Sequence, residues 1–193
     1  MISIALAAVG NVDPDAMTAV DASIRRAFGF EIKRMEPLED PVFALSQTRG
    51  QFDSSAILYR LSRAVPDGTI RLLALTERDL FIPILSFIFG HAQFRGAAAL
   101  VSLARLRQEF YKLPADPPLL HSRAMKEALH EVGHTLGLVH CSDRTCPMSL
   151  STNIHQVDVK GSDFCGGCAL LVRENVHVLN RQTSPANQAG GTE

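Results

Sequence analysis

The most informative stretch of this sequence is His130-Glu-Val-Gly-His134-Thr-Leu-Gly137-Leu-Val-His140. On a helix, His130 and His134 lie on one face, where their ring nitrogens can bind one zinc ion at about 2.0–2.1 Å. Glu131 lies one step round the helix, within reach of a water on the open side of the metal. Gly137 permits a left-handed turn, after which the chain doubles back and supplies His140 as a third ligand. Three protein ligands and one open position are typical of a catalytic zinc site.

This pattern is specific. With 7 His in 193 residues, a chance His-Glu-x-x-His is expected roughly 0.01 times per chain. Requiring Gly137 and His140 as well makes a chance match rarer still. The alternative interpretation is a polar helix that carries two solvated or structural histidines, and the complete set of residues argues against it.

Four cysteines follow in two pairs, Cys141-x4-Cys146 and Cys165-Gly-Gly-Cys168. Two closely spaced pairs separated by a loop are typical of a tetrahedral zinc site made of four thiolates. The two glycines leave the backbone free to point N–H groups at the sulfurs. Two disulfides and four unligated thiols are the alternatives. The sequence shows no secretion signal, which predicts a cytoplasmic, reducing setting and favours metal ligands.

The composition is that of an ordinary soluble globular protein, with 46% hydrophobic residues and a net charge of −1. A chain of this length can bury a core without disulfides. The near-neutral balance argues against a nucleic-acid partner. The most apolar internal stretch, residues 80–89, is too short to span a bilayer and contains Pro83, so we expect no membrane partner. Nothing in the sequence indicates an oligomeric state.

Strand and helix patterns alternate through the first half of the chain. Strands are predicted over residues 2–9, 31–35, 69–75, 87–89 and 97–103, and helices over residues 14–28 and after Asp53, with Ile57, Leu58 and Leu61 on the apolar face. The segment 90–96 is interpreted as a connector. Alternation of this kind predicts an α/β sheet covered by helices.

The second half has a different character. One helix is predicted over residues 119–136, followed by an irregular stretch over 138–164 and a last helix that starts at Asp163, with its body over 169–179. Residues 1–182 are expected to form a single catalytic domain, in which 1–137 carry the sheet and the active-site helix and 138–182 carry the four-cysteine site. The polar tail 183–193 is predicted to be disordered.

The complete signature is His130-Glu-x-x-His134-x-x-Gly137-x-x-His140-Cys141-x4-Cys146-x-Met148, closed by Cys165-x-x-Cys168. It resembles the archaemetzincins, a family of metzincin-clan zinc metallopeptidases. Met148 stands where metzincins carry a methionine turn beneath the zinc. The resemblance implies an α/β (α+β) metzincin-like fold: a twisted mixed sheet with helices, an active-site helix and a small C-terminal subdomain stapled by zinc. It also implies two zinc ions per chain, a catalytic one on the three histidines and a structural one on the four cysteines.

The implied activity is hydrolysis of peptide bonds in a peptide or protein substrate. Water activated by zinc gives a proton to Glu131, the general base, which passes it to the leaving amine. Aminopeptidase and endopeptidase action both stay open. The alternative is a zinc-binding scaffold or a peptide-binding regulatory module with little turnover, but such a module has no need of Glu131. Tyr59 and Tyr111, the only tyrosines, are candidate oxyanion donors.

The substrate is expected to lie extended and to pair with an exposed sheet edge, for which residues 89–97 are the candidate. His91 lies in this segment and is a candidate for a substrate contact. A surface histidine in a polar loop is the favoured interpretation of His91. The remaining single histidines, His121, His155 and His177, are interpreted as structural or solvated.

Overall fold

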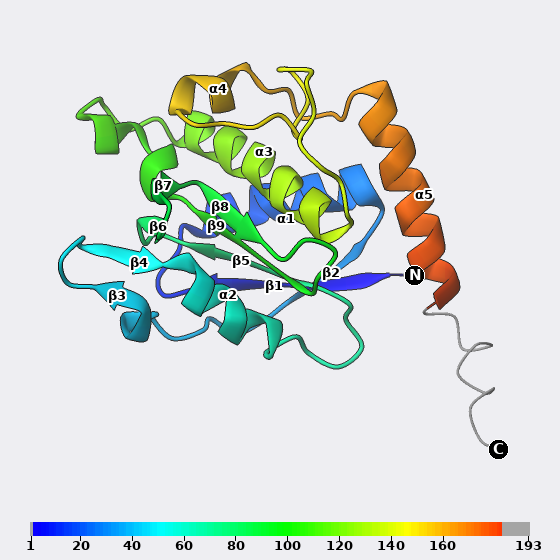
Figure 1. Ribbon diagram of the computed structural model, residues 1–193, viewed down its shortest axis with the longest axis horizontal. Helices are drawn as coiled ribbons and strands as arrows, with labels where there is room; N and C mark the ends of the chain where they lie inside the picture. The colour runs from blue at the N-terminus through cyan, green and yellow to red at the C-terminus, as the bar shows by residue number, and fades with distance from the viewer. Residues whose placement is uncertain (1, 183–193) are drawn as a thin grey trace.

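The computed structural model describes residues 2–182, so the tail 183–193 lies outside the described residues. Within them the fold is built on a five-stranded sheet with the order β2-β1-β5-β9-β8 (Figure 1). Its strands are β1 (Ser3–Val9), β2 (Glu31–Arg34), β5 (Leu72–Thr76), β8 (Gly90–Ala92) and β9 (Ala98–Ser102). Strands β2, β1, β5 and β9 run parallel, and β8 runs antiparallel to β9 at one edge.

Helices cover both faces of this sheet (Figure 1). They are α1 (Pro14–Phe28), α2 (Ser54–Ser62) and α3 (Pro117–Thr135). Along β1, Ile4 and Leu6 belong to the core with α1 and α3, whereas Ala5 and Ala7 belong to the core with α2. A strand buried on both faces reads as a continuous apolar run, which is why residues 2–9 carry no polar alternation. Helix α3 packs against α1, β9 and β8.

A second, smaller sheet has the order β3-β4-β6-β7 among the described residues. Its strands are β3 (Leu45–Ser46), β4 (Gln51–Asp53), β6 (Leu80–Ile82) and β7 (Leu85–Ile88). The prediction for residues 87–96 was wrong in detail, because the strand there ends at Ile88 and the supposed connector contains β8. Residues Gly90 to Ala92 become a strand only through pairing with β9, which the local sequence does not reveal.

The C-terminal part contains α4 (Ile154–Val159) and α5 (Gly166–Gln182). Helix α4 corrects the prediction of an irregular stretch over 138–164. Asn153 caps it by accepting a hydrogen bond from the Gln156 N–H at 3.2 Å, and its two buried residues, Ile154 and Val157, are too few to give a helical period. The last helix begins at Gly166 and not at Asp163.

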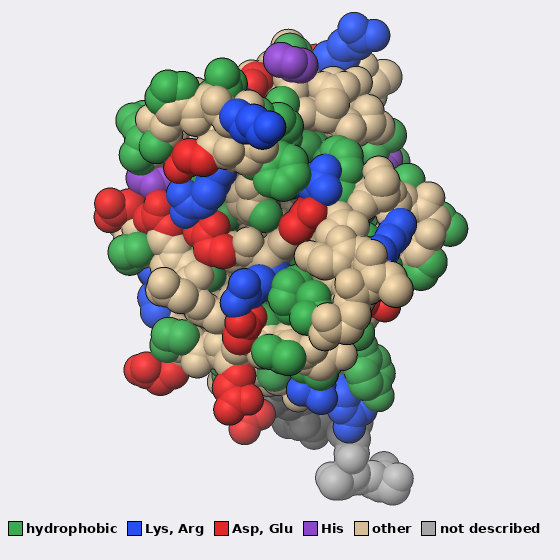
Figure 2. Space-filling model, turned by 90° about the vertical axis from the view of Figure 1, so that its left-hand side faces the viewer, with side chains coloured by type: hydrophobic (Ala, Val, Ile, Leu, Met, Phe, Trp, Pro, Cys, Tyr) green, Lys and Arg blue, Asp and Glu red, His purple; other side chains and the backbone are tan. Residues whose placement is uncertain are grey.

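Charged side chains of both signs are interleaved on the end of the molecule that carries the small sheet (Figure 2). Two ion pairs tie the segment after β9 to the turn between β5 and β6. Arg105 Nε lies 2.7 Å from Asp79 Oδ1, and Arg107 Nη2 lies 2.6 Å from Glu77 Oε1.

No helix within residues 2–182 has the length and apolar character needed to cross a membrane.

Candidate functional site

Helix α3 carries the central residues of the site. Asp116 caps its first turn by accepting a hydrogen bond from the Leu119 N–H at 3.0 Å. The helix then runs to Thr135, which confirms the predicted helix over 119–136 to within two residues. His130 and Glu131 lie near its C-terminal end and are 6% and 5% exposed.

The chain reverses direction directly after α3. The Gly137 N–H donates to the His134 carbonyl at 2.9 Å and the Leu138 N–H to the Gly133 carbonyl at 3.0 Å, a Schellman motif. Gly137 has a φ of +91°, and a Cβ built on it would lie 2.7 Å from Arg95 Nε. The expectation of a left-handed turn at this glycine is therefore confirmed. The turn brings His140 back beside the helix.

One ring nitrogen from each of His130, His134 and His140 lies within 4.8 Å of the other two. His130 Nδ1 is 2.8 Å from the Pro147 carbonyl and His134 Nδ1 is 2.8 Å from the Leu138 carbonyl. Because a carbonyl only accepts, both Nδ1 atoms carry protons, and in neutral rings both Nε2 atoms present lone pairs.

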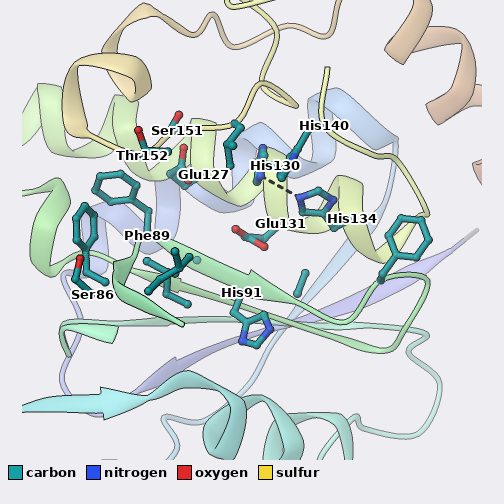
Figure 3. Close-up of a pocket in the computed structure, with 17 residues that line it drawn as sticks. Ser86, Phe89, His91, Glu127, His130, Glu131, His134, His140, Ser151 and Thr152 are labelled. Atoms are coloured by element: carbon teal, nitrogen blue, oxygen red, sulfur yellow. Dashed lines mark hydrogen bonds between the residues drawn. The ribbon is translucent and has the colours of Figure 1, made fainter. Parts of the chain in front are cut away.

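Those two Nε2 atoms face each other at 3.0 Å (Figure 3, dashed line). Two lone pairs at that distance repel unless a cation lies between them. The separation also suits two ligands that each bind zinc at about 2.0–2.1 Å. Burial lowers the pKa of His130 well below its usual value and also lowers the pKa of His134 and His140. The rings are therefore neutral at neutral pH, the form that binds metal, and the donor set fits zinc.

Glu131 lies between the histidines and the edge strand β8 (Figure 3). Burial raises the pKa of its carboxyl well above the ordinary value, and the neighbouring Glu127 raises it further, while Lys160 opposes them. A Cβ built on Gly90 would lie 2.4 Å from Glu131 Oε1 and 2.6 Å from its Cγ. Only glycine at position 90 therefore leaves the observed place for this carboxyl. Reasoning from the sequence missed Gly90, because no local signal links it to Glu131.

We expect Gly90→Ala to lower kcat/KM by about 10²-fold, because a displacement of about 1 Å in a reacting group can cost that much. The zinc content should stay at the wild-type value, because neither Gly90 nor Glu131 is a candidate ligand. Adding Gly90→Ala to Glu131→Gln should then cost almost nothing further, since the glycine acts through that carboxyl. Additive losses in this double-mutant cycle would contradict the conclusion that Gly90 acts by leaving space for the Glu131 carboxyl.

Met148 packs beneath α3. It is 0% exposed, and its Sδ lies 2.4 Å from the position that a Cβ on Gly133 would take. Its carbonyl accepts a hydrogen bond from the Cys141 N–H at 3.0 Å. Met148 therefore lies under the turn of α3 between His130 and His134, which is the place expected for the methionine turn.

The four cysteines form a second cluster, in which all the sulfurs lie within 4.8 Å of one another. Cys141 Sγ and Cys165 Sγ are 3.7 Å apart, a separation that suits two thiolates each about 2.3 Å from one zinc ion. A backbone hydrogen bond from Cys168 lowers the pKa of Cys165, whereas burial raises the pKa of Cys146 and Cys168. The backbone N–H groups of Cys165 and Met148 also point at Cys146. This donor set fits zinc as well.

A cavity of about 590 Å³ opens in front of the histidines, lined by α3, β7, β8 and the segment after Met148. His91 Nδ1 lies 2.9 Å from Ser54 Oγ at the start of α2, so its ring points away from α3 (Figure 3). Tyr59 is 63% exposed on α2, and the Tyr111 hydroxyl donates to the Arg105 carbonyl at 2.9 Å. Neither tyrosine lines the cavity. The same is true of His121, His155 and His177.

A buried ion pair behind the cavity also escaped the sequence-based prediction. Lys160 Nζ donates to Glu127 Oε1 at 2.8 Å, and the two side chains are 0% and 4% exposed. Glu127 precedes His130 by three residues, so helical spacing alone places it on the same side of α3. No comparable signal marks Lys160, which reaches Glu127 from the segment after α4.

Comparison with known proteins gives consistent matches. The model of peptidase family M54 matches residues 41–174. An archaemetzincin from Methanocaldococcus jannaschii is 38% identical over 168 residues, which cover 87% of this chain and 91% of that protein. One from Methanopyrus kandleri is 43% identical over 136 residues, which cover 70% and 74%. The crystal structure of archaemetzincin from Methanopyrus kandleri matches with a TM-score of 0.81 and 36% identity, covering 91% of this chain and 96% of that one.

Proposed function

Since the chain belongs to peptidase family M54, the archaemetzincins, and is a zinc metallopeptidase, we propose that Glu131 is its general base. We propose His130, His134 and His140 as the ligands of a catalytic zinc. One observation carries both assignments: a buried carboxyl lies beside a cluster of imidazoles whose unprotonated nitrogens face one another.

The bound zinc would supply a Lewis acid that acidifies a water molecule to a pKa of about 7 and polarises the substrate carbonyl. Glu131 accepts the proton of that water and hands it to the leaving amine. Burial raises the pKa of Glu131, which brings the carboxyl nearer to the basicity that suits proton transfer at neutral pH. Gly90 leaves the space in which the carboxyl stays aimed at the cavity.

The substrate is proposed to bind along β8 in an extended form. This strand pairs with β9 on one side and with no other strand of residues 2–182 on its other side. It also lines the cavity through Gly90, His91 and Ala92. Its free backbone groups can therefore add a peptide strand directly in front of Glu131. The proposed edge is shorter than the expected segment 89–97.

The four cysteines are proposed to hold a second, structural zinc. Such a site needs reduced thiols, and this requirement supports a cytoplasmic location. Adjacent residues, His140 and Cys141, would then serve two different ions. The thiolate site would fix the chain directly after the third ligand of the catalytic zinc.

A peptide-library digestion tests the activity. Zinc-loaded protein should cut library peptides, a chelator should stop the cutting, and added zinc should restore it. Mass spectrometry of the products then shows whether cuts fall inside peptides or only at their N-termini. Zinc-loaded protein that binds peptides but cuts none would support the regulatory-module alternative instead.

We expect His134→Ala to lose one zinc ion per chain and nearly all hydrolysis. The remaining two histidines hold zinc too weakly, whereas the cysteine cluster shares no residue with the site. Metal analysis of the purified variant should therefore fall from two zinc ions to one. A zinc content unchanged from wild type would contradict the proposed ligands.

A further inference from the structure

We infer that the cavity next to Glu131 selects a tyrosine side chain beside the scissile bond, through hydrogen bonds of its phenol to Glu127 and Ser151. The inference rests on the proposed function, because it takes the cavity as the place where substrate binds. It adds a substrate class that the zinc-site residues do not specify.

The proposed subsite lies one helical turn from the catalytic residues. Glu127 precedes Glu131 by four residues on α3, so the two side chains are neighbours on one helix face. Glu127, Ser151 and Thr152 line the same cavity as the histidines. In Figure 3 these three lie together at the end of the cavity away from His134. A side chain next to the reacting carbonyl can therefore reach them.

Glu127 offers one open acceptor at this end. Its Oε1 accepts from Lys160 Nζ at 2.8 Å, and its Oε2 has no hydrogen-bond partner among residues 2–182. The pair is neutral as a whole, so the carboxylate attracts a further cation only weakly. The proposed catalytic zinc, one turn away, also disfavours a second positive charge. A neutral donor on the substrate suits Oε2 better than an ammonium or guanidinium group.

Ser151 offers a complementary group. Its Oγ is buried and has no hydrogen-bond partner in the described part of the chain. Buried hydroxyls are normally hydrogen-bonded. Because Ser151 is a residue of the cavity wall, rotation about its Cα–Cβ bond can bring the unpaired hydroxyl to a ligand there. A phenol can donate to Glu127 Oε2 and accept from the Ser151 hydroxyl at the same time. An ammonium group can donate to both oxygens but leaves the proton of the Ser151 hydroxyl without an acceptor, and a phenyl ring can neither donate nor accept.

The walls of the subsite suit an aromatic ring. Phe87 and Phe89 both line the cavity, and their rings pack edge to face with centroids 5.3 Å apart. A tyrosine ring can add to this pair by the same kind of contact, with its hydroxyl directed toward the polar end. A serine or threonine side chain of the substrate is too short to contact the rings and the Glu127 carboxylate at the same time.

Three hydroxamate inhibitors test the inference without requiring turnover. They share one backbone and carry a 4-hydroxybenzyl, a benzyl or a 4-aminobutyl group at the position next to the hydroxamate. Affinities for the zinc-loaded protein are measured by calorimetry. We expect the 4-hydroxybenzyl compound to bind about 10- to 100-fold more tightly than the benzyl compound, the range for a hydrogen bond to a charged group. The 4-aminobutyl compound should bind most weakly.

Two variants and one control identify the residues responsible for the preference for the 4-hydroxybenzyl compound over the benzyl compound. Ser151→Ala should reduce it several-fold, and the double variant Glu127→Met, Lys160→Met should abolish it while benzyl affinity stays unchanged. Replacing both members of a buried ion pair avoids an unpaired charge. Thr152→Val is the control, because the Thr152 hydroxyl already donates to Gln156 Oε1 at 3.1 Å; this variant should keep the full preference.

Equal affinity for the benzyl and 4-hydroxybenzyl compounds would overturn the inference, and so would tightest binding of the 4-aminobutyl compound. A preference that survives in both Ser151→Ala and the double variant would overturn it too. Failure of the proposed function looks different: the inhibitors would still be discriminated while no peptide is cut. Cleavage without discrimination would leave the proposed function intact and remove only this inference.

Discussion

Glu131→Gln is expected to lower kcat/KM for a cleaved library peptide by about 10²–10⁴-fold, the usual loss when a general base is removed. The amide has nearly the same shape but cannot accept the proton. The zinc content should stay at the wild-type value, because Glu131 is not proposed as a ligand. Steady-state kinetics and metal analysis of the same preparation check both statements.

Stability separates a chemical loss from a folding loss in this variant. Burial disfavours the charged form of Glu131, so a neutral amide should leave Tm at or above the wild-type value. Glu31→Gln is the matched control, since Glu31 is exposed on β2 at the opposite edge of the sheet. It should keep full activity. Hydrolysis by Glu131→Gln within a few-fold of wild type would rule out the general-base assignment.

Cys165→Ser is expected to lower both the thermal stability and the affinity for the catalytic zinc, although Cys165 belongs only to the cysteine cluster. Structural zinc sites contribute about 10–16 kcal/mol in small peptides. Loss of even about 3 kcal/mol lowers Tm by roughly 6–12 °C in a domain of this size. The catalytic site should weaken because Cys141, another member of the cluster, directly follows His140.

Asp163→Ala provides the control for this variant, two residues earlier in the same segment. Asp163 is 88% exposed, and its carboxylate is 3.8 Å from Arg26, a surface pair of little value to stability. Native mass spectrometry and thermal melts should show two zinc ions and a wild-type Tm for the control. Wild-type protein with one zinc and a mass four hydrogens below that of the reduced chain would mean two disulfides and would refute the thiolate site.

Much of the fold could be predicted because its signals are local. The buried run of β1 and the amphipathic period of α1 each lie within one element, and the structure places both near the predicted ranges. The failures are short elements. Strand β8 has three residues and α4 has six, so neither has the length for a hydrophobic period. Their conformations are selected by pairing with β9 and by packing against α3.

The two clusters of potential metal ligands were predictable for a related reason. His130 and His134 are set on one face by helix geometry alone. Gly137 can adopt its positive φ because it has no side chain, which that backbone conformation would strain. The return of His140 follows from a spacing of a few residues, and so does the closeness of the two cysteines within each pair, whereas the meeting of Cys141 with Cys165 joins segments 24 residues apart. Such spacings leave the chain few ways to place the ligand atoms.

Residue spacing thus determined by itself which side chains are proposed to hold metal and which carboxyl stands beside them. Tertiary structure alone decided how the carboxyl is held and what surrounds it. Gly90 meets Glu131 only because β8 closes the sheet against α3. Lys160 meets Glu127 across 33 residues of sequence, and Ser151 lines the same cavity. The physical reason is that ligand spacing within a helix and its adjoining turn is set by backbone geometry, whereas contacts between distant segments depend on how the whole core packs.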